Sequence, residues 1–353
     1  WIERLDSPIR GAAQGPLAGL RFAAKDNIDV AGVPTTAGCP AFAYRPETHA
    51  TVVGRLLAAG AELLGKTNLD QFACGLNGTR SPYGAVPTGQ VDFALGTDTA
   101  GSGRVPAGLN NIVGLKPSRG LVSAHGVVPA AQSVDCVSIF APTVALATRV
   151  LTQAMGPDPR DPYSRRLRLA NAPFPRDFRF GVPDRLDFFG DLLAAAAFAA
   201  AVERLRALGG TPVTIAYAPL AQAAALLYES ALVADRHAAI RGFFDAHPEE
   251  VIEPVRSIIG AGRRYSATDY AQAQTHLRAL GQAAAAMWDS IDVLLVPTAP
   301  THYTIAQMQA DPVALNRNLG AYTNFVNLLD YAALSVPSSL RRDGLPFGIT
   351  LVG

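Results

Sequence analysis

The chain has 353 residues and an almost balanced charge, with 30 Lys and Arg against 29 Asp and Glu. This balance argues against nucleic acid or an anionic membrane as the main partner. Apolar residues make up 49% and charged residues 17% of the chain, which provides ample material for a core and argues against disorder. The three cysteines have no CxxC spacing, so a disulfide framework and a structural zinc site are disfavoured, and a cytoplasmic location is expected.

Both ends of the chain indicate a piece of a longer protein. The sequence begins at Trp1 without a signal-peptide pattern, and it stops at Gly353 directly after an apolar run, 347–352, that is typical of a core strand. No apolar run reaches the roughly 18 residues of a membrane span, and no repeat, low-complexity linker or charge block divides the chain. We therefore expect one domain over residues 1–353, with truncated ends.

Apolar residues alternate between strand and helix periods along the chain. We expect strands at 20–25, 61–65, 93–96, 178–183, 211–217, 292–297 and 347–352, and helices at 51–60 and 191–208. Gly60 and the pair Gly209-Gly210 stand where these helices end, as expected of C-terminal caps. Strands that alternate with helices predict an α/β domain with a covered sheet.

Metal and nucleotide chemistry find little support in the sequence. The six histidines include no HExxH motif and no close pair, so no metal site is expected. The glycine-rich segment 96–104 follows a strand, but Gly101 is followed by Ser102 and not by the lysine of a Walker loop, and no GxGxxG is present there. We therefore expect neither a metal nor another cofactor.

The same glycine-rich segment suits acyl transfer. Small residues at Ala100, Gly101 and Gly103 let the backbone around Ser102 curl and point successive N–H groups at one place, which is the geometry of an oxyanion hole. Lys25 ends an apolar strand, and a buried lysine has a lowered pKa and can act as a base. From the residues alone, a turn serine and a surface lysine at a strand end remain open alternatives.

Long motifs, in order along nearly the whole chain, resemble the amidase signature family. They are Lys25–Ile28, Gly65–Phe72, Gly96–Ala107, Gly114–Ser118 and Gly344–Gly348. The resemblance implies an α/β fold with a central twisted mixed β-sheet covered by helices. It also implies a Lys–Ser–Ser triad that hydrolyses amides without a metal.

Carried onto this sequence, the family pattern gives roles to the residues around the nucleophile loop. Lys25 becomes the base and Ser102 the acylated nucleophile. The backbone of the stretch Thr99, Ala100, Gly101 and Ser102 becomes the oxyanion hole. Asp98 and Arg104 are expected to form an ion pair that braces this loop. A purely structural salt bridge is the alternative reading of this pair, and the two readings are compatible.

The sequence departs from the family at one place. The family carries a Gly/Ser-rich segment before the nucleophile loop, and this segment supplies the bridging serine of the triad. Here Pro87 runs straight into Thr88, so the segment is missing and the bridging role falls to no printed residue. The intact motifs on both sides favour an omitted segment, and we expect a break in the chain between these two residues. A catalytically inactive scaffold is the alternative.

Within the family, the sequence is most similar to the allophanate hydrolases. The similarity lies in the Ala100 and Gly103 variants of the nucleophile loop and in three motifs, Asn77–Arg80, Pro297–Thr301 and Asn318–Phe325. That subgroup often has a further C-terminal domain, which is absent here. The resemblance to this subgroup implies that Tyr228 and Arg236 hold the substrate carboxylate. On an ideal helix these two residues would be about 12 Å apart along the axis and ~80° apart around it. The alternative is that Tyr228 is a half-buried aromatic residue of a helix and that Arg236 pairs with Asp235 or a nearby acid.

The expected activity is hydrolysis of allophanate with release of ammonia, late in urea degradation. The alternatives are another amide or carbamate hydrolase of the family and the glutamine-hydrolysing subunit of a tRNA amidotransferase. The expected partners are a small anionic substrate, a second copy in a homodimer and, functionally, a biotin-dependent urea carboxylase. Neither nucleic acid nor a membrane is expected as a partner.

Overall fold

A single mixed sheet organises the protein. The computed structural model describes residues 1–84, 91–170 and 174–353, and within them the sheet has 11 strands in the order β1-β3-β2-β4-β6-β5-β10-β11-β9-β7-β8. The strands are β1 (Glu3–Ile9), β2 (Arg21–Lys25), β3 (Glu62–Thr67), β4 (Phe93–Asp98), β5 (Val113–Lys116), β6 (Cys136–Ala141), β7 (Phe178–Pro183), β8 (Gly210–Ile215), β9 (Val293–Pro297), β10 (Ala333–Leu340) and β11 (Pro346–Val352).

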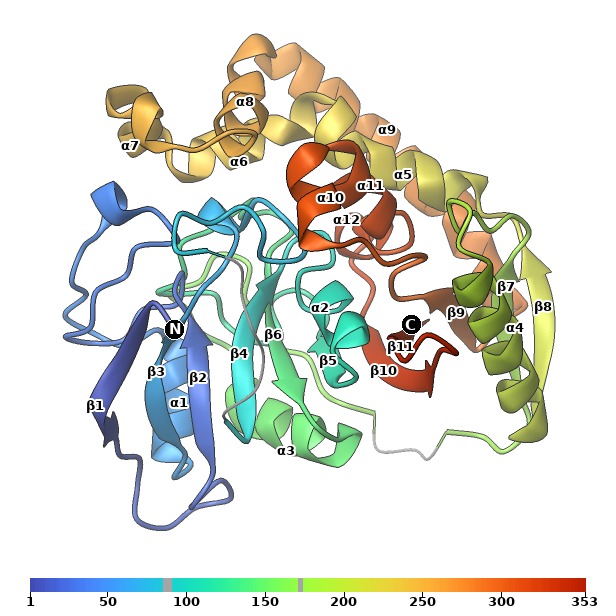
Figure 1. Cartoon of the computed structure of the whole chain (residues 1–353), viewed down its shortest axis with the longest axis horizontal. Helices are drawn as coiled ribbons and strands as arrows, with labels where there is room; N and C mark the ends of the chain where they lie inside the picture. Colours follow the sequence, from blue (N-terminus) through green and yellow to red (C-terminus); the bar gives the residue numbers. More distant parts are fainter. Residues whose placement is uncertain (85–90, 171–173) are drawn as a thin grey trace.

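Helices cover the sheet and extend beyond it. They are α1 (Thr51–Ala58), α2 (Val105–Leu109), α3 (Val144–Ala154), α4 (Leu192–Ala207), α5 (Ala218–Glu229), α6 (Ala234–Ala239), α7 (Arg241–Ala246), α8 (Val255–Gly260), α9 (Ala267–Ala285), α10 (Ile305–Ala310), α11 (Ala314–Leu319) and α12 (Asn324–Leu328). In Figure 1, α6, α7 and α8 gather at the top of the molecule, and α1 and α3 lie toward the bottom. No described helix is both long and apolar enough to cross a lipid bilayer.

The expected fold class is confirmed. All seven expected strands and both expected helices are present, with ends that differ by no more than two residues. Helix α4 is capped at its start, because the Asp191 carboxylate accepts the Ala194 N–H at 2.9 Å. The sheet mixes parallel pairs, such as β2 with β4, and antiparallel pairs, such as β4 with β6.

The sheet is buried against apolar clusters on its two sides. One cluster packs α1 and α3 against β2, β3 and β6, and another packs α5, α9 and α12 against β9 and the nucleophile loop. Phe22 of β2 and Phe93 of β4 stack with their ring centroids 5.2 Å apart, which ties the two neighbouring strands together.

The parallel pairing of β2 and β4 decides where the polar residues meet. Phe22, Ala23 and Ala24 pair with Phe93, Ala94 and Leu95 in register. The carboxyl ends of parallel neighbours lie at the same edge of a sheet, which is where α/β proteins build their sites. Lys25 at the end of β2 and the loop after β4 are therefore brought to one edge.

Candidate active site

Lys25 enters the site from the end of β2. Its Nζ donates a hydrogen bond to Thr97 Oγ1 on the neighbouring strand at 2.8 Å. Burial lowers the pKa of Lys25 to about 8, although the carboxylates of Asp70, Asp135 and Asp98 act in the opposite direction. A substantial fraction of the lysine is therefore neutral in mildly alkaline solution, as a base requires.

Ser102 lies in the loop after β4, and its position is fixed by contacts on both sides. Its Oγ donates to the Gly75 carbonyl at 2.8 Å. Gly101 has a φ of +139°, and a Cβ added there would fall 2.4 Å from Thr323 Oγ1. Thr323 Oγ1 in turn donates to the Ala100 carbonyl at 2.7 Å.

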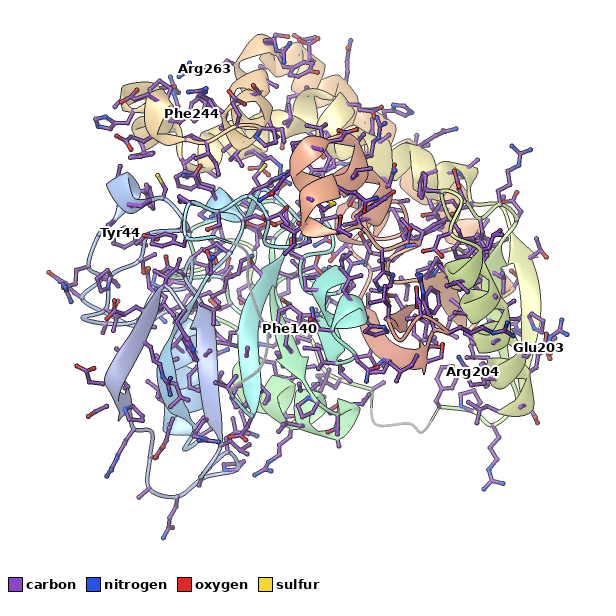
Figure 2. All side chains as sticks on the ribbon, viewed as in Figure 1. Tyr44, Phe140, Glu203, Arg204, Phe244 and Arg263 are labelled. Atoms are coloured by element: carbon purple, nitrogen blue, oxygen red, sulfur yellow. The ribbon has the colours of Figure 1, made fainter. Side chains whose placement is uncertain are left out.

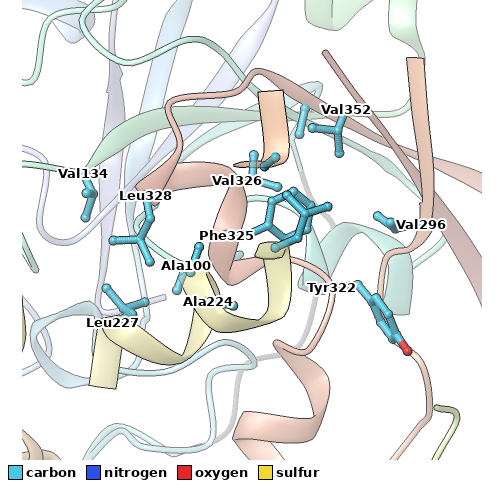
Figure 3. Close-up of a cluster of buried hydrophobic side chains, with 14 of the residues drawn as sticks. Ala100, Val134, Ala224, Leu227, Val296, Tyr322, Phe325, Val326, Leu328 and Val352 are labelled. Atoms are coloured by element: carbon cyan, nitrogen blue, oxygen red, sulfur yellow. The ribbon is translucent and has the colours of Figure 1, made fainter. Parts of the chain in front are cut away.

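The neighbours of Ser102 hold the loop rigid. Figure 3 shows Ala100 in one buried cluster with Leu227 of α5 and Phe325 of α12.

The Gly103 N–H donates to Asp98, whereas the backbone N–H groups of Ala100, Gly101 and Ser102 donate to no acceptor in the part of the chain described. Within the described residues, these N–H groups are available to stabilise a negatively charged oxygen, which is what an oxyanion hole does.

Asp98 and Arg104 form the ion pair that the sequence predicts. Arg104 Nε and Nη2 donate to the two carboxylate oxygens of Asp98 at 2.8 and 3.0 Å, and both side chains are fully buried. Burial by itself would raise the pKa of Asp98, but the neighbouring guanidinium holds it below its ordinary value. Arg104 also donates to the Thr323 carbonyl and to Asn327 Oδ1, so the pair connects the nucleophile loop to α12.

Lys25 and Ser102 face the same cavity, which has a volume of about 600 Å³. Among the described residues the two side chains do not bond each other, since Lys25 bonds Thr97 and Ser102 bonds Gly75. Most of the described lining is apolar and includes Phe140, which lies near the middle of the molecule (Figure 2). The expected break between Pro87 and Thr88 lies outside the described residues.

Several residues of the site were not singled out from the sequence. Asp70 accepts the N–H groups of Asn77, Gly78 and Arg80 at 3.2, 2.9 and 2.7 Å, and so shapes the loop that presents the Gly75 carbonyl to Ser102. Asp70 lies in the Gly65–Phe72 motif, and Asn77–Arg80 is itself a motif. The sequence therefore marked these residues as part of the family pattern but did not indicate that Asp70 binds this loop.

Asp135 is a second carboxylate that sequence reasoning missed. It accepts the Thr99 hydroxyl at 2.5 Å and the Ala130 and Ala131 N–H groups at 2.8 and 3.2 Å. Burial raises its pKa to about 6, although these hydrogen bonds and Arg236 act in the opposite direction. Its contact with Thr99 spans 36 positions of sequence, and no local pattern announces a contact of that kind.

Partly buried Tyr228 and buried Arg236 form a pair, but they do not share one helix. Tyr228 is in α5, the chain leaves that helix at Ser230, and Arg236 is in α6. The spacing of an ideal helix therefore does not apply to this pair, because Ser230 adopts an extended conformation between the two helices. Arg236 Nη2 donates to the Tyr228 hydroxyl at 3.1 Å, and the guanidinium lies 5.0 Å from the ring centroid.

The remaining polar atoms of Arg236 have no partner in the described part of the chain. Its side chain is only 2% exposed, yet Nε and Nη1 make no hydrogen bond. Asp235, the expected alternative partner, instead accepts from Ser133. The described lining of the Ser102 cavity includes neither Tyr228 nor Arg236, although the Asp70 charge acts on the Tyr228 hydroxyl.

Among the described residues, no three His, Cys, Asp or Glu side chains gather as they would to hold a metal ion. The site instead offers a lysine of lowered pKa, a serine hydroxyl and backbone N–H groups without an acceptor among the described residues. These groups fit acyl transfer from an amide.

Comparison with known proteins agrees with that chemistry. The Amidase family model matches residues 1–88 and 85–353. Urea amidolyase of Saccharomyces cerevisiae is 45% identical over 364 residues, which cover 96% of this chain and 20% of that protein. A glutamyl-tRNA(Gln) amidotransferase subunit of Halobacterium salinarum is 35% identical over 403 residues, covering 99% of this chain and 94% of that protein.

A solved structure extends the likeness to three dimensions. Allophanate hydrolase of Kluyveromyces lactis superposes with a TM-score of 0.92 at 42% identity, over 96% of this chain and 59% of that one. The chain thus spans about a fifth of the urea amidolyase and about three-fifths of this hydrolase.

Proposed function

Because the chain belongs to the amidase signature family, we propose that the protein, once it carries the bridging serine of that family, hydrolyses allophanate (urea-1-carboxylate) and releases ammonia through a covalent acyl-enzyme. Ser102 Oγ attacks the carbonyl of the terminal amide, and its proton passes to neutral Lys25 through a bridging serine. The backbone N–H groups of 99–102 stabilise the oxygen that becomes negative. The C–N bond then breaks, the proton goes to the departing ammonia, and water releases the acyl group from Ser102.

The observation that carries the choice of substrate is the buried guanidinium of Arg236. Unpaired buried charge is strongly unfavourable, and two of its nitrogens have no partner among the described residues. A carboxylate matches the planar fork of a guanidinium with two parallel hydrogen bonds. Allophanate carries such a carboxylate next to its amide, and the Tyr228 hydroxyl is a second donor.

The similarities support the same choice. Two relatives that cover nearly all of this chain are named for urea and allophanate, at 45% and 42% identity. On this basis we also propose a place late in urea degradation, a functional link to a biotin-dependent urea carboxylase, a homodimeric assembly and a cytoplasmic location.

The bridging serine belongs to the proposal as well. The family match is made in two pieces that meet at residues 85–88, where the Gly/Ser-rich segment of the family is absent from the sequence. The yeast alignment runs over 364 positions although this chain has 353 residues, so the relative has positions without a counterpart here. We propose that the natural protein carries this segment between Pro87 and Thr88, and activity is to be assayed with the intact natural protein.

Ammonia release from three amides tests the activity. We expect release from allophanate and none from glutamine, and only slow release from biuret, which has a carboxamide in place of the carboxylate. Preference for glutamine would favour the amidotransferase alternative. No release from any amide would favour an inactive scaffold.

Replacing Arg236 tests the substrate contact. A hydrogen bond to a charged group contributes ~1.5–3 kcal/mol, and each 1.4 kcal/mol is a factor of about ten. We therefore expect Arg236→Ala to lower kcat/KM for allophanate about ten- to a hundredfold and to leave biuret nearly unchanged. Tyr228→Phe should show the same selectivity with a smaller loss. Arg263→Ala, at a half-exposed arginine of the same helical region, is the matched control. Equal losses on both substrates would make Arg236 structural.

A further inference from the structure

A short segment, Ala130–Asp135, lies between the nucleophile loop and the helix that carries Arg236. At its far end, Asp135 accepts the Thr99 hydroxyl and the N–H groups of Ala130 and Ala131. The segment is therefore closed on itself and tied to the residue that begins the proposed oxyanion hole.

The middle of the segment is tied to α6. Asp235 Oδ2 accepts both the Ser133 N–H at 3.0 Å and the Ser133 hydroxyl at 2.5 Å. Asp235 directly precedes Arg236 in a helix of only six residues. A helix of six residues has little stability by itself, so two hydrogen bonds to a charged carboxylate contribute strongly to holding it in place.

A third contact fixes the segment to the core. Asn327 of α12 donates from Nδ2 to the Val134 carbonyl at 3.1 Å and to the Asp98 carbonyl at 2.7 Å. Ser133 and Arg236 therefore share one hydrogen-bonded frame with the nucleophile loop. That frame connects the helix that carries Arg236 to the loop that carries Ser102.

We propose that Ser133 is a positioning residue for anion recognition, acting through Asp235 to hold Arg236 at a fixed place relative to the nucleophile. Ser133 does not touch the substrate in this scheme. The inference rests on the proposed function, because it assigns to Ser133 the alignment of the group that binds the substrate carboxylate. Misplacing such a group by about an ångström is enough to lower the rate strongly.

The test is a set of variants of the intact protein, assayed on allophanate and on biuret. Ser133→Ala should lower kcat/KM for allophanate about tenfold and change the value for biuret less than twofold. Ser133→Thr, which keeps a hydroxyl, should restore most of the loss. Asp235→Asn should reproduce the selective loss, and it serves as the second route if Ser133→Ala folds poorly. Ser290→Ala is the control, because its hydroxyl also donates to a nearby acceptor, the Met287 carbonyl.

The double variant Ser133→Ala/Arg236→Ala separates positioning from general support. If Ser133 acts through Arg236, the double variant should be no slower on allophanate than Arg236→Ala alone. Losses that multiply, or equal losses on allophanate and biuret, would overturn the inference while the wild type still hydrolyses allophanate. A wild type without allophanate activity would overturn the proposed function itself.

Discussion

In the proposed mechanism, Lys25 determines the pH at which Ser102 reacts. The ammonium form cannot accept a proton, so the reactive enzyme in this proposal is the fraction with neutral Lys25. Burial lowers the pKa of this side chain to about 8, against the opposing effect of the nearby carboxylates. The neutral fraction therefore grows as pH rises toward and past 8.

The pH dependence of activity follows from that direction. We expect kcat/KM for allophanate to rise about tenfold per pH unit well below about pH 8 and to level off above it. Rates measured between about pH 6 and 10 would check this, with Ser102→Ala as the inactive control. A profile that is flat across this range, with chemistry rate-limiting, would contradict a titrating Lys25.

We expect Arg104 to stabilise the protein more than an exposed arginine does. Removing one partner of a buried ion pair leaves the other charge unpaired and destabilises proteins by about 3–5 kcal/mol. We expect Arg104→Ala to lower the free energy of unfolding by that amount, as measured by urea denaturation. Arg206→Ala is the control, since its pair with Glu203 is half-exposed and such pairs contribute ~0–1 kcal/mol. Similar losses of unfolding free energy for both variants would mean that the buried pair with Asp98 stabilises the protein no more than an exposed pair.

At the scale of elements, the nucleophile loop accepts no side chain at Gly101. Its φ of +139° and the 2.4 Å approach to Thr323 Oγ1 both oppose a Cβ. We expect Gly101→Ala to abolish activity and to lower the melting temperature. Gly54→Ala in α1 is the matched control, because an added Cβ there meets nothing within 4 Å, and alanine should stabilise the helix by about 0.5–1 kcal/mol. An active Gly101→Ala protein would show that the loop can move.

The elements also show what the sequence can and cannot predict. Strands such as β7 and helices such as α4 were predicted from period and caps, because those signals are local. The separation of α5 from α6 was missed, since the side chains around Ser230 keep an Ala-rich helical appearance while the backbone turns extended. The contact of Asp135 with Thr99 was missed for a different reason: it depends on how distant segments meet. Lys25 and Ser102 were assigned by family resemblance, which their own surroundings alone would not have justified.

At the scale of the whole molecule, our proposal makes activity depend on a short segment that would supply the bridging serine of the triad. We expect the 353-residue chain as printed to fold but not to hydrolyse allophanate. Insertion of the corresponding segment of the yeast urea amidolyase between Pro87 and Thr88 should restore activity. The same insert with its serines changed to alanine is the control. Full activity of the printed chain would contradict a required bridging serine.

The positions of the two groups of residues have a consequence for how new specificities arise. Lys25 is the last residue of β2 and Ser102 lies in the loop after β4, and these neighbouring strands are held in register by backbone hydrogen bonds. Tyr228 and Arg236 belong to α5 and α6, in the run of helices toward the top of Figure 1. In the proposed mechanism, the catalytic groups and the groups that choose the substrate therefore lie on different elements of the fold. Transplanting residues 218–264 between relatives offers a route to chimeric amidases that keep their catalytic pair and exchange their substrates.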